Sequence, residues 1–344
     1  MESEILAQVI RGETVESIHR GHLIVVDGGG ETLYSLGNPE AVTFWRSSAK
    51  AFQAIPFLTG GAAGQFGYTD KEIALACGSH SGERRHTETA AGMLAKIGLN
   101  ESDLRCGAHL PFDEKRAAEM LKSGEEPTQL HNNCSGKHAA MLAFTKHANA
   151  DITSYEQLEH PLQKAILECV ARFTDVPAGA IKIGIDGCAA PNFAVPVSAM
   201  AKAFARLVVP PPDYDEATKI ACQRIVSAML DFPEMIGGTE RLDTMLMREA
   251  HGRLISKIGA EGVYSAAVLP SEKYPKGLGI ALKIEDGDDK RARAVVLIEL
   301  LRQLGIFGEE ILKEYSPLPI KNRRGNWVGE TRACFDLINN LSSG

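Results

Sequence analysis

The chain has 344 residues, of which 44% are hydrophobic and 24% are charged, and its formal net charge is −7. This is the composition of a globular protein that is long enough to bury a large core. The excess of acidic residues argues against a surface for nucleic acid or anionic membranes, so we expect a small-molecule substrate.

The N-terminal residues and the cysteines indicate the compartment. The sequence M-E-S-E-I-L has acids where a signal peptide would be basic, and no apolar run is long enough to span a bilayer. The seven cysteines are odd in number and contain no C-x-x-C, which favours free thiols or metal ligands over a disulfide framework. We therefore expect a cytoplasmic protein with no nucleic-acid and no membrane partner.

The first predicted elements form a hairpin and two helices. Apolar runs at 22–26 and 32–36 flank Asp27-Gly28-Gly29-Gly30, which reads as a turn, because the phosphate-binding alternative lacks Gly-Lys-Ser/Thr. Helical spacing follows over 43–58, and Thr69 with Glu72 forms a capping box that opens the next helix.

Later segments alternate between helical and strand patterns. We expect helices over 83–97, 113–123, 136–147, 155–173, 197–207, 214–230 and 290–304, and strands over 181–185, 193–195, 254–257, 262–268 and 279–284. This order predicts an α/β protein with one catalytic domain over residues 1–344. Its sheet is built from both ends of the chain, and a largely helical region is inserted over about 65–180.

Two serine clusters offer nucleophilic chemistry. Ser47 and Lys50 are three residues apart, so on a helix they share a face, and Lys257 is a candidate cation for lowering the pKa of Lys50. About one S-x-x-K is expected by chance in such a chain, and an exposed lysine is the plain alternative. Ser79 and His80 lie between glycines and suit carboxylate binding or proton relay, or an ordinary loop.

Two cysteines lie in Gly-containing polar clusters. Cys134 and Cys188, with a third donor, offer a zinc site, for which His138 is the more usual third ligand than Lys137. Spacing alone favours two unrelated buried cysteines. A further alternative makes Cys134 a nucleophile with His131 or His138 as its base.

Lys257 lies in a strand-like segment, Ser256-Lys257-Ile258-Gly259. A lysine on a strand beside a serine-lysine helix is similar to the K-T-G element of penicillin-recognising enzymes, although Ile258 replaces the hydroxyl residue. The alternative is an ordinary edge-strand lysine.

The clusters, in this order, resemble the asparaginase II family of L-asparaginases. The resemblance extends from about Gly21 to Asp336 and is carried by F-W-R-S-S-A-K-A-F-Q, A-C-G-S-H-S-G-E, H-N-N-C-S-G-K-H-A-A-M, G-I-D-G-C-A-A-P-N-F and G-A-E-G-V-Y. It implies hydrolysis of L-asparagine to L-aspartate and ammonia. It also implies a fold like that of serine β-lactamases and glutaminases, with an antiparallel-rich sheet flanked by helices, and a homodimer.

The resemblance also assigns site residues. It implies catalytic pairs Ser47–Lys50 and Ser79–Lys257, and one zinc ion per chain held by Cys134, Lys137 and Cys188, with His138 and Asp186 beside it. We expect Arg46, His80, Glu261 and Gly262, which lie in the same motifs, at the substrate.

The resulting hypothesis is a serine acyl-enzyme mechanism. Ser47 is the expected nucleophile and Lys50 its base, and Ser79 with Lys257 is the alternative pair. Rival classes are another serine hydrolase of the β-lactamase or glutaminase type, and a non-enzymatic zinc or amino-acid sensor. A secretion signal and a K-T-G box would favour the first rival, and both are missing. The two serine-lysine pairs argue against the second rival.

Overall fold

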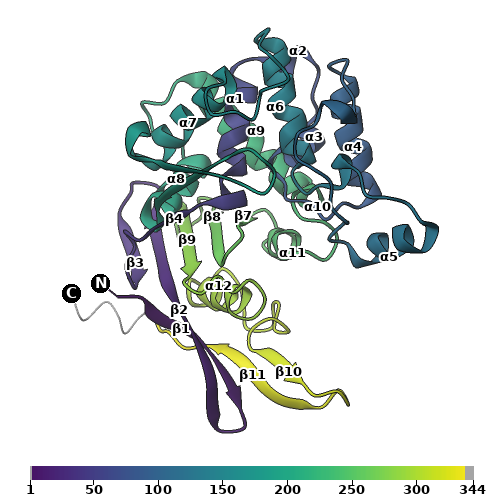
Figure 1. Ribbon diagram of the computed structural model, residues 1–344. Coiled ribbons are helices and arrows are strands. Elements are labelled where there is room, and N and C mark those ends of the chain that lie inside the picture. Colours follow the sequence, from purple (N-terminus) through teal and green to yellow (C-terminus); the bar gives the residue numbers. More distant parts are fainter. Residues whose placement is uncertain (1, 338–344) are drawn as a thin grey trace.

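A computed structural model describes residues 2–337 of the chain. Its main sheet has eight antiparallel strands in the order β10-β11-β1-β2-β9-β8-β7, with β3 also paired to β2. These strands are β1 (Glu4–Arg11), β2 (Thr14–Asp27), β3 (Thr32–Leu36), β7 (Leu254–Ile258), β8 (Val263–Val268), β9 (Leu278–Ile284), β10 (Leu318–Lys321) and β11 (Trp327–Ala333). Strands from both ends of the chain therefore lie side by side (Figure 1).

The helices lie mainly in the middle of the chain. They are α1 (Lys50–Thr59), α2 (Ala62–Gln65), α3 (Asp70–Cys77), α4 (Arg84–Ala95), α5 (Glu114–Ser123), α6 (Ser135–His147), α7 (Pro161–Thr174), α8 (Val197–Val208), α9 (Glu216–Asp231), α10 (Pro233–Ile236), α11 (Leu242–Glu249) and α12 (Ala292–Gln303). Short 3₁₀ turns span Arg46–Ala49, Glu101–Asp103, Gln129–His131 and Ala178–Ala180.

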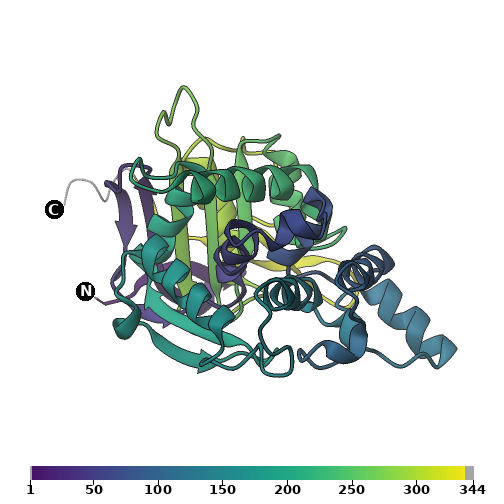
Figure 2. The ribbon, with the colours of Figure 1, turned by 90° about the horizontal axis from the view of Figure 1, so that it is seen from above.

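The main sheet is buried on both faces over β7, β8, β9 and the second half of β2, whereas β10 and β11 are largely half-buried or exposed. Successive side chains of β2 alternate, so that Ile24 and Val26 join the core shared with the helical region, whereas Leu23 and Val25 join the core beneath α12. Helix α8 crosses β2, β8 and β9 so closely that a Cβ on Gly279 would lie 2.0 Å from the Ala201 carbonyl oxygen. Seen from above, helices cover this face of the strands (Figure 2).

A second, three-stranded sheet leads into the serine cluster. It has the order β4-β6-β5 and consists of β4 (Val42–Phe44), β5 (Lys182–Ile185) and β6 (Pro191–Pro196). The amide of Trp45 continues this pairing by donating to the Phe193 carbonyl at 2.9 Å. The sheet thereby fixes the chain just before Arg46.

The predicted fold class is confirmed: the protein is mixed α/β, with an antiparallel sheet flanked by helices and a helical region between its two halves. The 22–36 hairpin and the Thr69–Glu72 capping box are also confirmed. The helix expected over 43–58 is wrong in its first part, because Val42–Phe44 pairs with β6 and Arg46 has a φ of +56°. The helix expected over 155–173 begins only at Pro161, whose missing N–H suits a first turn.

The strands β1, β10 and β11 and the helix α11 had not been expected. In the part of the chain that the structure describes, no helix is both long and apolar enough to cross a membrane.

Candidate active site

A cavity of about 760 Å³ lies where the helical region meets β7, α11 and the loops of the second sheet. Ser47, Ser79, Cys134 and Cys188 all line it, although they come from four separate segments of the chain. Charged side chains line it too: Arg46, Asp186, Glu240, Arg241, Asp289, Lys290 and Arg293. Ile258, Gly259 and Ala260 line it as well, so the structure brings all five predicted polar clusters to one cavity.

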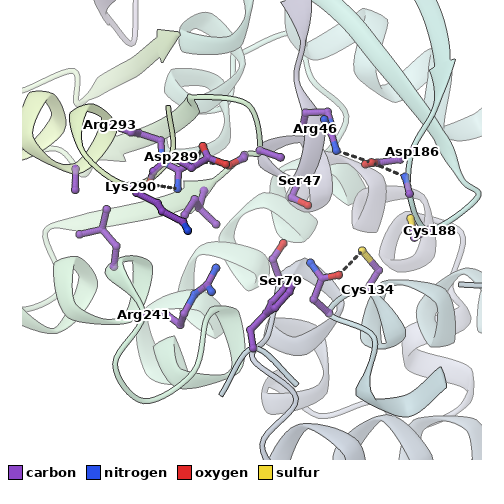
Figure 3. A pocket seen from close by; sticks show the side chains of 18 of the residues that line it. Arg46, Ser47, Ser79, Cys134, Asp186, Cys188, Arg241, Asp289, Lys290 and Arg293 are labelled. Atoms are coloured by element: carbon purple, nitrogen blue, oxygen red, sulfur yellow. Dashed lines mark hydrogen bonds and ion pairs between the residues drawn. The ribbon is translucent and has the colours of Figure 1, made fainter. Parts of the chain in front are cut away.

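Ser47 and Ser79 face each other across this cavity. Ser47 lies in the 3₁₀ turn before α1 and is half-buried, whereas Ser79 follows α3 and is only 3% exposed. Figure 3 shows the two side chains pointing toward one another. Ser48 points away and donates to the Lys257 carbonyl at 2.8 Å.

Both predicted lysines contact Ser79. The Nζ atoms of Lys50 and Lys257 each lie 2.9 Å from the Ser79 Oγ. Lys50 also donates to the carbonyls of Gly78 at 2.6 Å and Asn133 at 3.2 Å. Three N–H groups thus meet three acceptors, which is the arrangement of a protonated amine. No hydrogen bond joins Lys50 to Ser47 among the described residues. The contact expected between Lys50 and Ser47 is therefore replaced by the contact between Lys50 and Ser79.

Lys257 occupies a different environment. It is completely buried, and its Nζ lies 2.9 Å from the Ile258 carbonyl and 3.8 Å from Asp243 Oδ2. Burial lowers the pKa of Lys257 to about 7, with further lowering by the Lys50 cation and opposition from the Asp243 carboxylate. A neutral amine has two N–H groups and one lone pair, so it can accept the Ser79 proton.

Asp243 is a site residue that sequence analysis missed. It is 1% exposed, accepts hydrogen bonds from Tyr264 Oη and the Ile258 amide, and lies beside Lys257. The available signal was a single acid in the otherwise apolar stretch L-D-T-M-L-M. A buried acid of this kind calls for a specific partner.

The predicted metal ligands also meet. Lys137 Nζ donates to Cys188 Sγ at 3.1 Å, and the Cys134 thiol donates to Asn133 Oδ1 at 3.6 Å. Interaction between the two thiol groups lowers the pKa of Cys188 and raises the pKa of Cys134, so a single thiolate, on Cys188, is favoured. Among the described residues, no group of three His, Cys, Asp or Glu side chains could hold a metal ion.

His138 and Asp186 flank the thiols. His138 Nδ1 lies 2.7 Å from Tyr155 Oη, whereas its buried Nε2 has no hydrogen-bond partner within residues 2–337. Asp186 Oδ1 pairs with Arg46 Nη2 at 3.1 Å at the wall of the cavity. The left-handed backbone of Arg46 is held by its amide, which donates to Asn192 Oδ1 at 3.0 Å.

Three residues expected at the substrate do not line the cavity. His80 is fully buried, bonds Ser135 Oγ at 2.9 Å and stacks on His86. Glu261 is exposed, and the Gly262 amide donates to Asp289 Oδ1 at 2.8 Å. These residues shape the loops around the cavity, and Arg46 alone of the four lies at its surface.

Comparison with known proteins gives two kinds of result. Among curated protein sequences, none matches the chain significantly. Two similar solved structures are a probable glutaminase from Bacillus subtilis in complex with 6-diazo-5-oxo-L-norleucine and a β-lactamase from Burkholderia ambifaria. The first has 11% identity, coverage of 83% of this chain and 84% of that one, and a TM-score of 0.40. The second has 13% identity, coverage of 83% and 92%, and a TM-score of 0.38.

Those likenesses are too distant to carry an argument about this chain. A protein-family model, L-asparaginase II, matches residues 7–333 of the chain. This confirms the resemblance found in the sequence motifs. The chain therefore belongs to the L-asparaginase II family, whose members are amidohydrolases acting on small molecules.

Proposed function

We propose that this amidohydrolase converts L-asparagine to L-aspartate and ammonia through an acyl-enzyme on Ser47. The observation that carries the proposal is the convergence of two buried lysines on Ser79, directly across the cavity from Ser47. A nucleophile requires an accessible hydroxyl and a path for its proton. Ser47 supplies the first, and Ser79 with Lys257 supplies the second.

Acylation follows from this arrangement. Ser47 Oγ attacks the side-chain amide carbon of asparagine, its proton passes to Ser79 Oγ, and the Ser79 proton passes to Lys257 Nζ. The tetrahedral intermediate then collapses as the C–N bond breaks. The departing nitrogen takes a proton back from Lys257 through Ser79 and leaves as ammonia.

Deacylation uses the same proton path, with water as the nucleophile and Ser47 as the leaving group. Water attacks the Ser47 ester, and its proton travels through Ser79 to neutral Lys257. Breakage of the ester bond returns the proton to Ser47 Oγ and releases aspartate. Lys50 remains a fixed cation that orients the Ser79 oxygen and favours the neutral form of Lys257.

One observation favours a second assignment within the same mechanism. Ser79, unlike Ser47, is hydrogen-bonded directly to Lys257, so it meets the geometric test for a serine with its own base. Against it, Ser79 is 3% exposed and already accepts from Lys50, which leaves it little freedom to attack. We therefore assign relay to Ser79 and attack to Ser47.

We further propose that Cys134, Lys137 and Cys188 hold one zinc ion. Two thiols and an amine are nitrogen and sulfur donors of the type that zinc prefers, and the unpartnered buried Nε2 of His138 lies in the same region. Bound zinc would supply a nearly neutral anchor that orders the cavity wall and the substrate, while the serine remains the nucleophile.

Elemental analysis of the purified protein is expected to find about one zinc per chain. Cys134→Ser and Cys188→Ser are expected to abolish it, whereas Cys222→Ser, in the buried part of α9, is expected to keep it. Because zinc is assigned a positioning role, removing it is expected to raise KM more than it lowers kcat. A metal-free native protein with full activity would overturn the site.

Ammonia release is the direct test of the proposed activity. We expect turnover of L-asparagine well above that of L-glutamine, and none of a β-lactam such as benzylpenicillin. Absence of ammonia release from asparagine would refute asparagine as the substrate, faster turnover of glutamine would make glutamine the preferred substrate, and hydrolysis of the β-lactam alone would favour the rival serine hydrolase. The homodimer and the cytoplasmic location expected from sequence stay predictions alongside this proposal.

A further inference from the structure

Most charged side chains that line the cavity have an oppositely charged neighbour. Arg46 pairs with Asp186 at 3.1 Å, and Arg293 pairs with Asp289. Glu240 pairs with Lys115 at 3.7 Å on the surface. These pairs leave two cavity cations, Arg241 and Lys290.

Arg241 has no carboxylate within ion-pair distance and donates no side-chain hydrogen bond within the described residues. Its guanidinium instead lies over the Phe112 ring, 5.6 Å from the ring centre. Figure 3 shows Arg241 and Lys290 pointing into the same part of the cavity, on the side opposite Arg46 and Asp186. Arginine in a cavity with all five donors unused is suited to a carboxylate ligand.

The position of Arg241 is fixed by its neighbours. It directly precedes α11, whose Asp243 contacts Lys257. The loop before it is anchored at Thr239, whose amide and hydroxyl donate to the Glu83 carboxylate at 2.7 and 3.0 Å. Arg241 is thus held on the same short segment that supports the proposed base, so a ligand on Arg241 has a defined distance to Ser79.

Electrostatics favours an anion at this point. Lys50 is a buried cation, and Lys290 and Arg241 add two more positive charges on one side of the cavity. The positive charge of Arg241 also lowers the pKa of Lys257. A carboxylate bound between Arg241 and Lys290 would offset the mutual repulsion of these groups.

We propose that Arg241, with Lys290 beside it, binds the α-carboxylate of the amide substrate and thereby determines which amides are hydrolysed. This rests on the proposed function in assuming that the amide carbon is placed at Ser47. In asparagine three bonds join that carbon to the carboxylate carbon, and in glutamine four, so an anchor at a fixed distance selects between them. Arg46 is the weaker candidate, because Asp186 already neutralises it.

The test compares three substrates on the wild type, Arg241→Met and Arg241→Lys. L-Asparagine has both the carboxylate and the amine, succinamate has only the carboxylate, and β-alaninamide has only the amine. In Arg241→Met we expect kcat/KM to fall about a hundredfold for the two carboxylates and less than about threefold for β-alaninamide. Arg241→Lys keeps the positive charge but loses the planar guanidinium that can donate two parallel hydrogen bonds. For the two carboxylates we therefore expect its kcat/KM to lie between those of the wild type and Arg241→Met.

Two controls separate binding from indirect effects. Measurement at about pH 9 keeps Lys257 neutral in every variant, so a shift in its pKa has no influence on the comparison. Arg248→Met, a half-exposed change on the same helix whose partner is Glu234 at 3.5 Å, is expected to leave all three substrates unchanged. Equal losses on all three substrates in Arg241→Met, or no loss on asparagine, would overturn the carboxylate assignment while the proposed function stands.

A calorimetric measurement tests the anchor without turnover. L-Aspartate is expected to bind Arg241→Met about a hundredfold more weakly than the wild type, with Arg248→Met unchanged. If the wild type does not hydrolyse asparagine, the proposed function fails, yet loss of aspartate binding in Arg241→Met would still support the anchor. Equal aspartate affinities in these proteins would refute it.

Discussion

Ser47→Ala is expected to lose at least about a thousandfold in kcat, because the hydroxyl that forms the acyl-enzyme is gone. The substitution removes one oxygen from a half-buried turn and leaves both lysines on Ser79, so the fold and KM are expected to change little. Steady-state ammonia release with L-asparagine measures the loss.

The neighbouring serine provides a matched control. Ser48→Ala removes a buried hydroxyl that donates to the Lys257 carbonyl at 2.8 Å, so we expect about 1–3 kcal/mol less stability but a much smaller defect in kcat. Near-normal turnover in Ser47→Ala, together with a dead Ser79→Ala, would transfer the nucleophile to Ser79.

Lys257→Met is expected to lower kcat by about a hundredfold to ten-thousandfold, the usual contribution of general acid–base catalysis. In the wild type the base must be neutral, so kcat is expected to rise with pH through about 7, the pKa to which burial lowers Lys257, and to level off above it. In the variant this acid limb is expected to disappear. A pH–rate profile between about pH 5 and 10 measures both effects.

Lys50→Met is expected to shift the acid limb of the pH–rate profile without abolishing it. Because the Lys50 cation lowers the pKa of Lys257, its removal is expected to move the acid limb to higher pH while the limb itself persists. An unmoved limb in Lys50→Met, or an intact limb in Lys257→Met, would contradict the assignment of the base.

The sequence predicted which residues form the site better than it predicted which of them contact one another. Sequence motifs pointed to Ser47, Ser79, Cys134 and Cys188, and all four line the cavity. Helical spacing, however, assigned Lys50 to Ser47. The 3₁₀ turn before α1 and the tertiary position of Ser79 decide that contact, and neither is visible in a local pattern.

The same limit applies to the fold. The capping box at Thr69 depends on residues three apart, and it was predicted correctly. Strand β1 was missed although it forms a tight hairpin with β2 at Gly12; its other pairing, with β11 more than 300 residues away, is specified by nothing local. Asp243 was missed for a related reason, since only the approach of β7 gives a lone acid on α11 its role.

Trapping of the acyl-enzyme is the most direct test of the central claim. The protein is mixed with L-asparagine, quenched with acid within milliseconds, digested with trypsin and analysed by mass spectrometry. Trypsin cuts after Arg46 and Lys50, so Ser47 and Ser79 fall on different peptides. We predict an aspartyl ester on the peptide that begins at Ser47, and its absence in Ser47→Ala. An ester on the peptide that contains Ser79, or turnover without any ester, would contradict the account.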